Sequence, residues 1–205
     1  MEIKLENIGR RFNREWIFRN INYTFTQGSS YAILGANGSG KSTLLSVIAG
    51  SLTPTEGELF YKAEDRKIDV EDVFEKLALA APYLELIEEF TLSEVIDFHF
   101  RFKSYKEGLD PSAVMDLLGL AKSKNKAIKF FSSGMKQRAK LILAFCSDTP
   151  ILLLDEPTSN LDQKGVEWYY ELIQQFAKNR LVVVCSNQEH EYHFSQHQLF
   201  VSDYK

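Results

Sequence analysis

The sequence predicts an α/β fold in which a mostly parallel sheet is flanked by helices, with an antiparallel β edge and an inserted helical subdomain. Three observations predict it. A glycine-rich stretch at 35–43 follows an apolar run and precedes a helix-like run; a second apolar run at 151–154 ends in two carboxylates; and residues 83–140 are mainly helical in pattern. We expect one domain over residues 1–205, with an α/β core at 1–82 and 141–205 and the helical insert at 83–140.

Composition narrows the class of protein. With 44% hydrophobic and 25% charged residues, the chain resembles a soluble globular protein, and its apolar runs are far shorter than the roughly 18 residues that cross a bilayer. A net charge of −4 argues against a nucleic-acid-coating protein, so no nucleic acid is expected. Cys146 and Cys185 lie in apolar runs, as expected of buried thiols in a reducing cytoplasm.

The first elements form the antiparallel edge. Residues 3–8 and 17–25 alternate apolar and polar positions, which predicts two strands joined by a turn at 10–15. Phe12 lies in this turn, where an aromatic ring near a phosphate-binding loop could stack on an adenine base. Trp16 is a second candidate, and ordinary core packing is the alternative for both.

The remaining elements follow from apolar periodicity and from capping residues. We expect strands at 31–34, 58–61, 77–81, 181–185 and 199–202, and helices at 43–49, 92–102 and 111–118. Gly50 suits the left-handed end of the first helix, whereas Thr91 and Asp110 are N-caps of the other two. The basic residues of 122–140 are expected to form a solvated face.

Residues 35–43 read GANGSGKST and match the phosphate-binding pattern G-x-x-x-x-G-K-[ST]. Glycines permit backbone angles that turn successive N–H groups toward one anion, and the following helix directs its positive end to the same point. Lys41 adds a positive charge for the terminal phosphates, and Ser42 offers a hydroxyl to Mg²⁺. A glycine-rich turn before a buried helix is the alternative. The predicted nucleotide contacts are Gly35, Ala36, Asn37, Gly38, Ser39, Gly40, Lys41, Ser42 and Thr43.

Asp155 and Glu156 end the apolar run 151–154. If this strand lies beside the strand at 31–34 in a parallel sheet, both carboxyl ends meet at the edge where such sheets bind ligands. Asp155 would then face the metal held by Ser42. Glu156 would accept a proton from, or orient, a water that attacks the γ-phosphate. The alternative is a strand end capped by acids.

A second anion-binding device is predicted at Ser132, Ser133 and Gly134, which stand immediately before a helix-like run. One nucleotide gripped from one side needs only one such device. We therefore expect the second one to serve the nucleotide of another subunit.

Together these motifs resemble the ATP-binding-cassette ATPases, which have a P-loop NTPase core, and the resemblance spans nearly the whole chain. Residues 35–42 are similar to Walker A, 151–156 to Walker B with the catalytic glutamate, 159–162 to the D-loop, and Phe12 falls at the position of the adenine-stacking aromatic. Residues 131–135 are similar to the family signature L-S-G-G-Q: Ser132 and Gly134 agree with it, whereas Phe131 stands for the leucine, Ser133 for the first glycine and Met135 for the glutamine. The resemblance implies that ATP with Mg²⁺ is held between two cassettes packed head to tail.

Two further departures from the family pattern concern the Q-loop glutamine and the switch histidine. Residues 82–89 lack the Q-loop glutamine, and Glu85 is either a stand-in or a surface acid. Asn187 replaces the switch histidine; its amide can donate a hydrogen bond to the γ-phosphate but carries no charge. The nearby histidines, His190, His193 and His197, are expected at the surface.

The resemblance implies an ATP-hydrolysing subunit of an ABC transporter, with Glu156 and Lys41 as catalytic residues. We expect a homodimer on the cytoplasmic side of the cell membrane, attached to an integral membrane subunit through the face formed by residues 83–102. A soluble, non-transport cassette is one alternative. A nucleotide-gated regulatory subunit with weak hydrolysis is another, because the glutamine and the histidine are missing.

Overall fold

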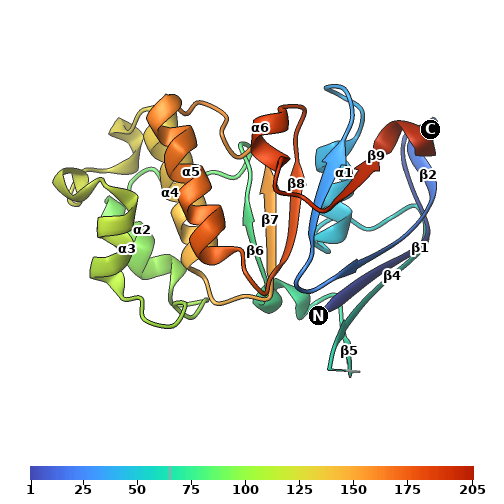
Figure 1. Cartoon of the computed structure of the whole chain (residues 1–205), viewed down its shortest axis with the longest axis horizontal. Helices are drawn as coiled ribbons and strands as arrows, with labels where there is room; N and C mark the ends of the chain where they lie inside the picture. Colours follow the sequence, from blue (N-terminus) through green and yellow to red (C-terminus); the bar gives the residue numbers. More distant parts are fainter. Residues whose placement is uncertain (65) are drawn as a thin grey trace. The chain divides into compact units, whose positions relative to one another are not determined.

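Two sheets and a group of helices make up the computed structural model, which describes residues 1–64 and 66–205 (Figure 1). The chain forms two units. The first contains Met1–Leu79, Pro150–Glu156 and Asn179–Lys205, and the second contains Ala80–Thr149 and Pro157–Lys178. Relative to the predicted insert 83–140, the second unit also includes residues 80–82, 141–149 and 157–178.

The antiparallel sheet of the first unit has the strand order β2-β1-β4-β5. Its strands are β1 (Glu2–Phe12), β2 (Glu15–Thr26), β4 (Glu56–Ala63) and β5 (Arg66–Ile68). The expected hairpin is confirmed, but its turn is shorter than predicted, because Phe12 pairs with Glu15 and so ends the strand. Ile3, Leu5 and Ile8 are all buried, and a register shift between Leu5 and Ile8 returns Ile8 to the buried face.

The parallel sheet has the order β6-β7-β8-β3-β9. Its strands are β3 (Ser30–Leu34), β6 (Leu77–Ala80), β7 (Ile151–Asp155), β8 (Leu181–Cys185) and β9 (His197–Phe200). The sequence analysis supposed that β7 lies directly beside β3. This is wrong, because β8 lies between them and pairs with both. The three strands are parallel, so their carboxyl ends still meet at one edge. The last strand, expected at 199–202, begins and ends two residues earlier.

Two helices of the first unit follow strands of this sheet. They are α1 (Lys41–Ile48) after β3 and α6 (Glu189–Tyr192) after β8. α1 packs against β7 and β8 through an apolar face that includes Leu44, Leu45 and Ile48, all fully buried. The predicted left-handed glycine is confirmed, with φ of 73° at Gly50. This packing fixes the segment between β3 and α1, where the phosphate-binding pattern lies.

The second unit is helical. Its helices are α2 (Leu92–His99), α3 (Pro111–Leu118), α4 (Ser133–Cys146) and α5 (Gln163–Phe176), and α4 and α5 run side by side (Figure 1). The sequence analysis assigned no helix to α5, and it placed the end of α2 three residues too late. The predicted caps are confirmed: Thr91 forms a capping box with Glu94, and Asp110 accepts from the backbone of Ala113.

Short 3₁₀ helices complete the described structure: η1 (Val73–Lys76), η2 (Ala121–Ser123), η3 (Ile128–Phe130) and η4 (Val201–Tyr204). Among the helices described, none combines the length and the apolar character required to span a bilayer.

His99 is a polar residue in the interior of the helical unit. Its Nε2 lies 2.9 Å from the Ser147 hydroxyl, which in turn donates to the Leu143 carbonyl at 2.7 Å. Burial and, to a smaller extent, the positive charge of Lys103 lower the pKa of His99 to about 4, against the opposing effect of the Leu143 backbone. The folded unit therefore disfavours the protonated ring.

This depressed pKa predicts acid sensitivity. Stability is unaffected by His99 above pH 6.5 and falls as the pH drops from about 6.5 to about 4, because the unfolded chain takes up the proton first. At pH 5 the loss is about 2 kcal/mol relative to pH 7. In His99→Asn this part of the loss disappears, as measured by denaturant unfolding at both pH values. Equal losses in parent and variant would contradict the assignment.

Candidate functional site

The loop between β3 and α1 has the backbone that its glycines predict. Gly35, Gly38 and Gly40 have φ of 152°, 75° and 106°. A Cβ at Gly35 would stand 2.6 Å from the Ser39 hydroxyl, and one at Gly40 would collide with Ile17. The loop borders a cavity of about 200 Å³, whose lining residues are Ile17, Asn37, Gly38, Gly40, Lys41, Ser42, Thr43 and Glu156.

Lys41 begins α1 and is only 5% exposed. Its ammonium donates hydrogen bonds to the carbonyls of Gly35 at 2.7 Å and Ala36 at 3.3 Å. The charge is thus held inside the loop by neutral carbonyl dipoles. Because a phosphate oxygen is a stronger partner for an ammonium than a carbonyl, the arrangement favours an anion in the cavity.

Asp155, at the end of β7, is 2% exposed. Burial raises the pKa of its carboxyl and the charge of Glu156 adds to this, whereas a hydrogen bond with Ser42 and the charge of Lys41 oppose it. Its Oδ1 atom has no hydrogen-bond partner among the residues that the structure describes. A buried carboxylate oxygen beside a serine hydroxyl can act as a ligand for a hard cation.

A Mg²⁺ ion fits this pair of oxygen donors. Within 1–64 and 66–205 there is no group of three or more His, Cys, Asp or Glu that could hold a metal ion by itself. Mg²⁺ bound to nucleotides takes only one or two protein ligands and completes its octahedron with phosphate oxygens and water. Asp155 and Ser42 match that requirement.

Glu156 follows Asp155 and lines the same cavity. Its φ is 41°, a left-handed conformation that glutamate rarely adopts, and its backbone N–H donates to the Cys185 carbonyl at 2.9 Å. The conformation turns the chain out of the strand at the sheet edge. Strained backbone of this kind is concentrated at functional sites.

Asn187 lies at the same edge, in the segment after β8. Its side-chain amide donates to Oδ1 of Asn37, in the phosphate-binding loop, at 2.6 Å. The predicted nucleotide contact therefore lies next to the loop and is bonded to it.

The two aromatic candidates differ in their surroundings. Phe12 is 46% exposed, and the Arg10 guanidinium covers its ring at 4.6 Å. The register of the hairpin shifts between Arg10 and Arg11, and Phe12 ends β1 beyond this shift. Trp16 pairs with Arg11, and the guanidinium groups of Arg11 and Arg19 lie over its ring at 5.3 and 4.1 Å. Of the two rings, Phe12 is the more exposed.

The signature-like segment belongs to the second unit. Ser132 is the N-cap of α4 and accepts from the Met135 backbone at 3.2 Å; Ser133 and Gly134, expected before the helix, form its first turn. A Cβ at Gly134 would stand 2.8 Å from the Asn160 carbonyl, so only glycine fits there. The cavity beside the phosphate-binding loop is built from the first unit without these residues.

Three polar contacts in the second unit were not predicted. Gln137 is buried and donates to the Pro157 carbonyl at 2.8 Å, which fixes the start of the D-loop-like segment. Lys140 donates to the Pro82 carbonyl at 2.8 Å, and Lys136 pairs with Glu88 at 2.6 Å. Both lysines therefore anchor the segment that lacks the glutamine, although the sequence analysis assigned them to a solvated face.

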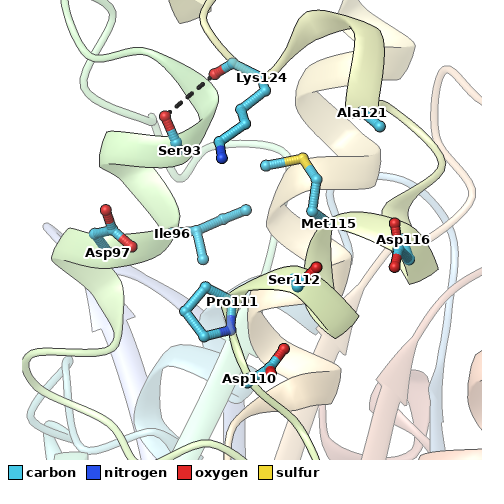
Figure 2. A pocket seen from close by; sticks show the side chains of 10 residues that line it. All are labelled: Ser93, Ile96, Asp97, Asp110, Pro111, Ser112, Met115, Asp116, Ala121 and Lys124. Atoms are coloured by element: carbon cyan, nitrogen blue, oxygen red, sulfur yellow. Dashed lines mark hydrogen bonds between the residues drawn. The ribbon is translucent and has the colours of Figure 1, made fainter.

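A cavity of about 540 Å³ lies between α2 and α3 in the second unit (Figure 2). Its lining includes the apolar side chains of Ile96 and Met115 and the acidic residues Asp97, Asp110 and Asp116. Asp110 is already committed to the cap of α3. None of the predicted site residues lines this cavity.

Comparison with known proteins agrees with the geometry of the phosphate-binding loop. The model of the ABC transporter family matches residues 18–159. The chain is 30% identical over 190 residues to the uncharacterised ABC transporter ATP-binding protein YybJ of Bacillus subtilis (strain 168), an alignment covering 92% of this chain and 86% of that protein. It is 28% identical to the lantibiotic transport ATP-binding protein SrtF of Streptococcus pyogenes, over 90% of this chain and 79% of SrtF.

Among solved structures, the dimeric bacterial ABC transporter cassette MJ0796 has a TM-score of 0.81 and 25% identity, with 97% of this chain and 94% of that chain covered. An ATP-binding subunit of an ABC transporter has a TM-score of 0.83 at 20% identity, over 98% of this chain and 85% of that one, which supports the fold.

The glycine geometry predicts the effect of Gly40→Ala. The variant combines a positive φ with a collision against Ile17, so we expect nucleotide affinity to fall at least about tenfold, measured by calorimetric titration. Gly28→Ala is the matched control: its φ is also positive, 85°, but the added methyl group meets open space. The control should lose about 1 kcal/mol of stability and retain its affinity. Equal affinities in both variants would contradict the site.

Proposed function

This chain belongs to the ABC transporter family, and we propose that it is the ATP-binding and ATP-hydrolysing subunit that powers a separate membrane subunit through ATP-driven dimer closure. One observation carries the proposal: a glycine loop with left-handed backbone holds a buried ammonium, and beside it lies a buried carboxylate with one oxygen that has no partner among the described residues. This combination is suited to a nucleoside triphosphate with Mg²⁺.

We propose the following roles in binding. The backbone N–H groups of residues 35–43 and the start of α1 hold the phosphates, and the Lys41 ammonium moves from the loop carbonyls to the terminal phosphates. Ser42 and Asp155 would hold Mg²⁺, which neutralises charge on the phosphates. Phe12 would offer its ring to the adenine.

Glu156 is the proposed general base. Its carboxylate lines the phosphate cavity, one residue beyond the proposed Mg²⁺ ligand Asp155, so it can take a proton from a water directed at the γ-phosphate. The Cys185 carbonyl holds its backbone at 2.9 Å, which keeps the side chain at the sheet edge. In-line attack by this water releases inorganic phosphate and leaves ADP.

We propose a dimer in which Ser132, Gly134 and Met135 of one copy contact the nucleotide of the other. Ser132 offers its hydroxyl, and the first turn of α4 offers free N–H groups and the positive end of the helix dipole. The MJ0796 cassette is dimeric, which supports this arrangement. Hydrolysis would follow closure of the two copies.

The proposed membrane partner docks on the aromatic face of the second unit. Ile87, Phe98 and Phe102 are 40%, 39% and 64% exposed, and the Phe98 and Phe102 rings contact each other at 5.3 Å. A contiguous exposed apolar surface of this kind favours a protein partner. Through that partner the chain would be peripheral on the cytoplasmic face of the membrane, with no nucleic acid bound.

Glu156→Gln tests the catalytic assignment. The amide cannot accept the proton, so kcat should fall at least about 100-fold while ATP affinity is retained and an ATP-bound dimer accumulates. Phosphate release and light scattering in the presence of ATP measure the two effects. Hydrolysis at the parent rate would refute the role of Glu156.

Phe98→Asp combined with Phe102→Ser tests the docking face. When solubilised membranes are passed over the immobilised chain, the parent should retain a polytopic membrane polypeptide, which mass spectrometry identifies. The double variant should not retain it, because burying a charge in an apolar contact is costly. ATPase activity of the isolated chain should remain. Phe200→Ser, which changes a ring of 45% exposure on β9, is the control. Retention of the polypeptide by the double variant would place docking elsewhere.

A further inference from the structure

Cys185, which ends β8, and the two residues after it form hydrogen bonds with three parts of the proposed ATP site. The Cys185 carbonyl accepts from the Glu156 backbone at 2.9 Å, and the Ser186 N–H donates to the Ile33 carbonyl of β3 at 3.3 Å. The Asn187 side chain donates to Asn37 at 2.6 Å. One short segment is thus bonded to the proposed base, to the strand before the phosphate loop, and to the loop itself.

Asn37 occupies the outer turn of the loop. The Ser39 N–H donates to the Ala36 carbonyl at 3.0 Å, which closes a tight turn with Asn37 and Gly38 at its tip. A Cβ on Gly38 would meet no atom within 4 Å, so the tip projects away from surrounding structure. The bond from Asn187 therefore restrains a part of the loop that packing leaves free.

The other end of this contact is rigid. Ser186 and Glu191 are both fully buried, and the Ser186 hydroxyl donates to the Glu191 carboxylate while accepting from the Gln188 backbone at 2.8 Å. Glu191 lies on α6, which follows directly. A buried carboxylate bonded to a buried hydroxyl is costly to break, so the backbone on both sides of Asn187 is fixed.

We propose that Asn187 is a positioning residue, which holds the phosphate-binding loop in its nucleotide-binding conformation through Asn37, with Ser186 and Glu191 as its fixed base. The proposal rests on the proposed function of this loop in binding ATP. It differs from direct donation by Asn187 to the γ-phosphate, because the Nδ2 group is bonded to the loop. Both groups of the pair are neutral amides, so the restraint does not depend on pH in the physiological range.

The two roles predict different nucleotide selectivity. The loop holds the inner phosphates as well as the terminal one, so loss of its restraint weakens ATP and ADP alike. Loss of a contact to the γ-phosphate weakens ATP and leaves ADP unchanged. A merely structural role of Asn187 in folding would change stability without changing either affinity in the folded protein.

A double-mutant cycle on the full chain tests the restraint. Affinities for MgATP and MgADP are measured by calorimetric titration for the parent, Asn187→Ala, Asn37→Ala and the combined variant, with Asn125→Ala, an exposed asparagine of the second unit, as control. Each single variant should weaken both nucleotides by about three- to tenfold, the scale of one lost hydrogen bond. The combined variant should be no weaker than either single one.

Weakening of ATP alone in the Asn187 variants, effects that multiply in the combined variant, or unchanged affinities would each overturn the proposed restraint. These outcomes are distinct from a parent chain that fails to bind ATP, which would overturn the proposed function itself.

Discussion

The site depends on the burial of two opposite charges at one edge of the parallel sheet. Lys41 and Asp155 are almost removed from water, so their charges must be matched by fixed polar groups. The loop carbonyls solvate the ammonium, whereas the carboxylate keeps one oxygen without a partner among the described residues. Left-handed glycines, a tightly packed α1 and three apolar strands ending side by side all serve to hold this pair in place.

Much of the fold followed from local patterns. The turn of the glycine-rich loop, the strand before it, the helix after it, and the caps Thr91 and Asp110 each depend on residues close together in sequence, and the structure confirms them. The order of the strands, in contrast, does not depend on neighbouring residues. β7 and β8 are both short apolar runs, and nothing within either run indicates which one pairs with β3. The missed α5 mixes aromatic and polar residues, and its one buried face becomes evident only against α4.

The candidate site divides in the same way. Lys41, Ser42, Asp155 and Glu156 were predicted because their roles are tied to short motifs, and all four belong to one edge of the first unit. The contacts of Lys140 with Pro82 and of Asn187 with Asn37 join residues 58 and 150 positions apart. A single sequence does not show which distant residues form such contacts. A lysine that bonds to a distant carbonyl therefore looks the same in the sequence as a lysine on a solvated face.

The left-handed Glu156 has a consequence for how this chain evolves. Glycine or asparagine would adopt φ of 41° with less strain, so selection for a sturdier fold alone would replace the glutamate. Retaining the proposed general base at this position therefore trades stability of the fold for ATP turnover. A homologue that binds nucleotide without hydrolysing it would not need the glutamate. Glycine or asparagine, which adopt this backbone conformation with less strain, would then be expected at this position.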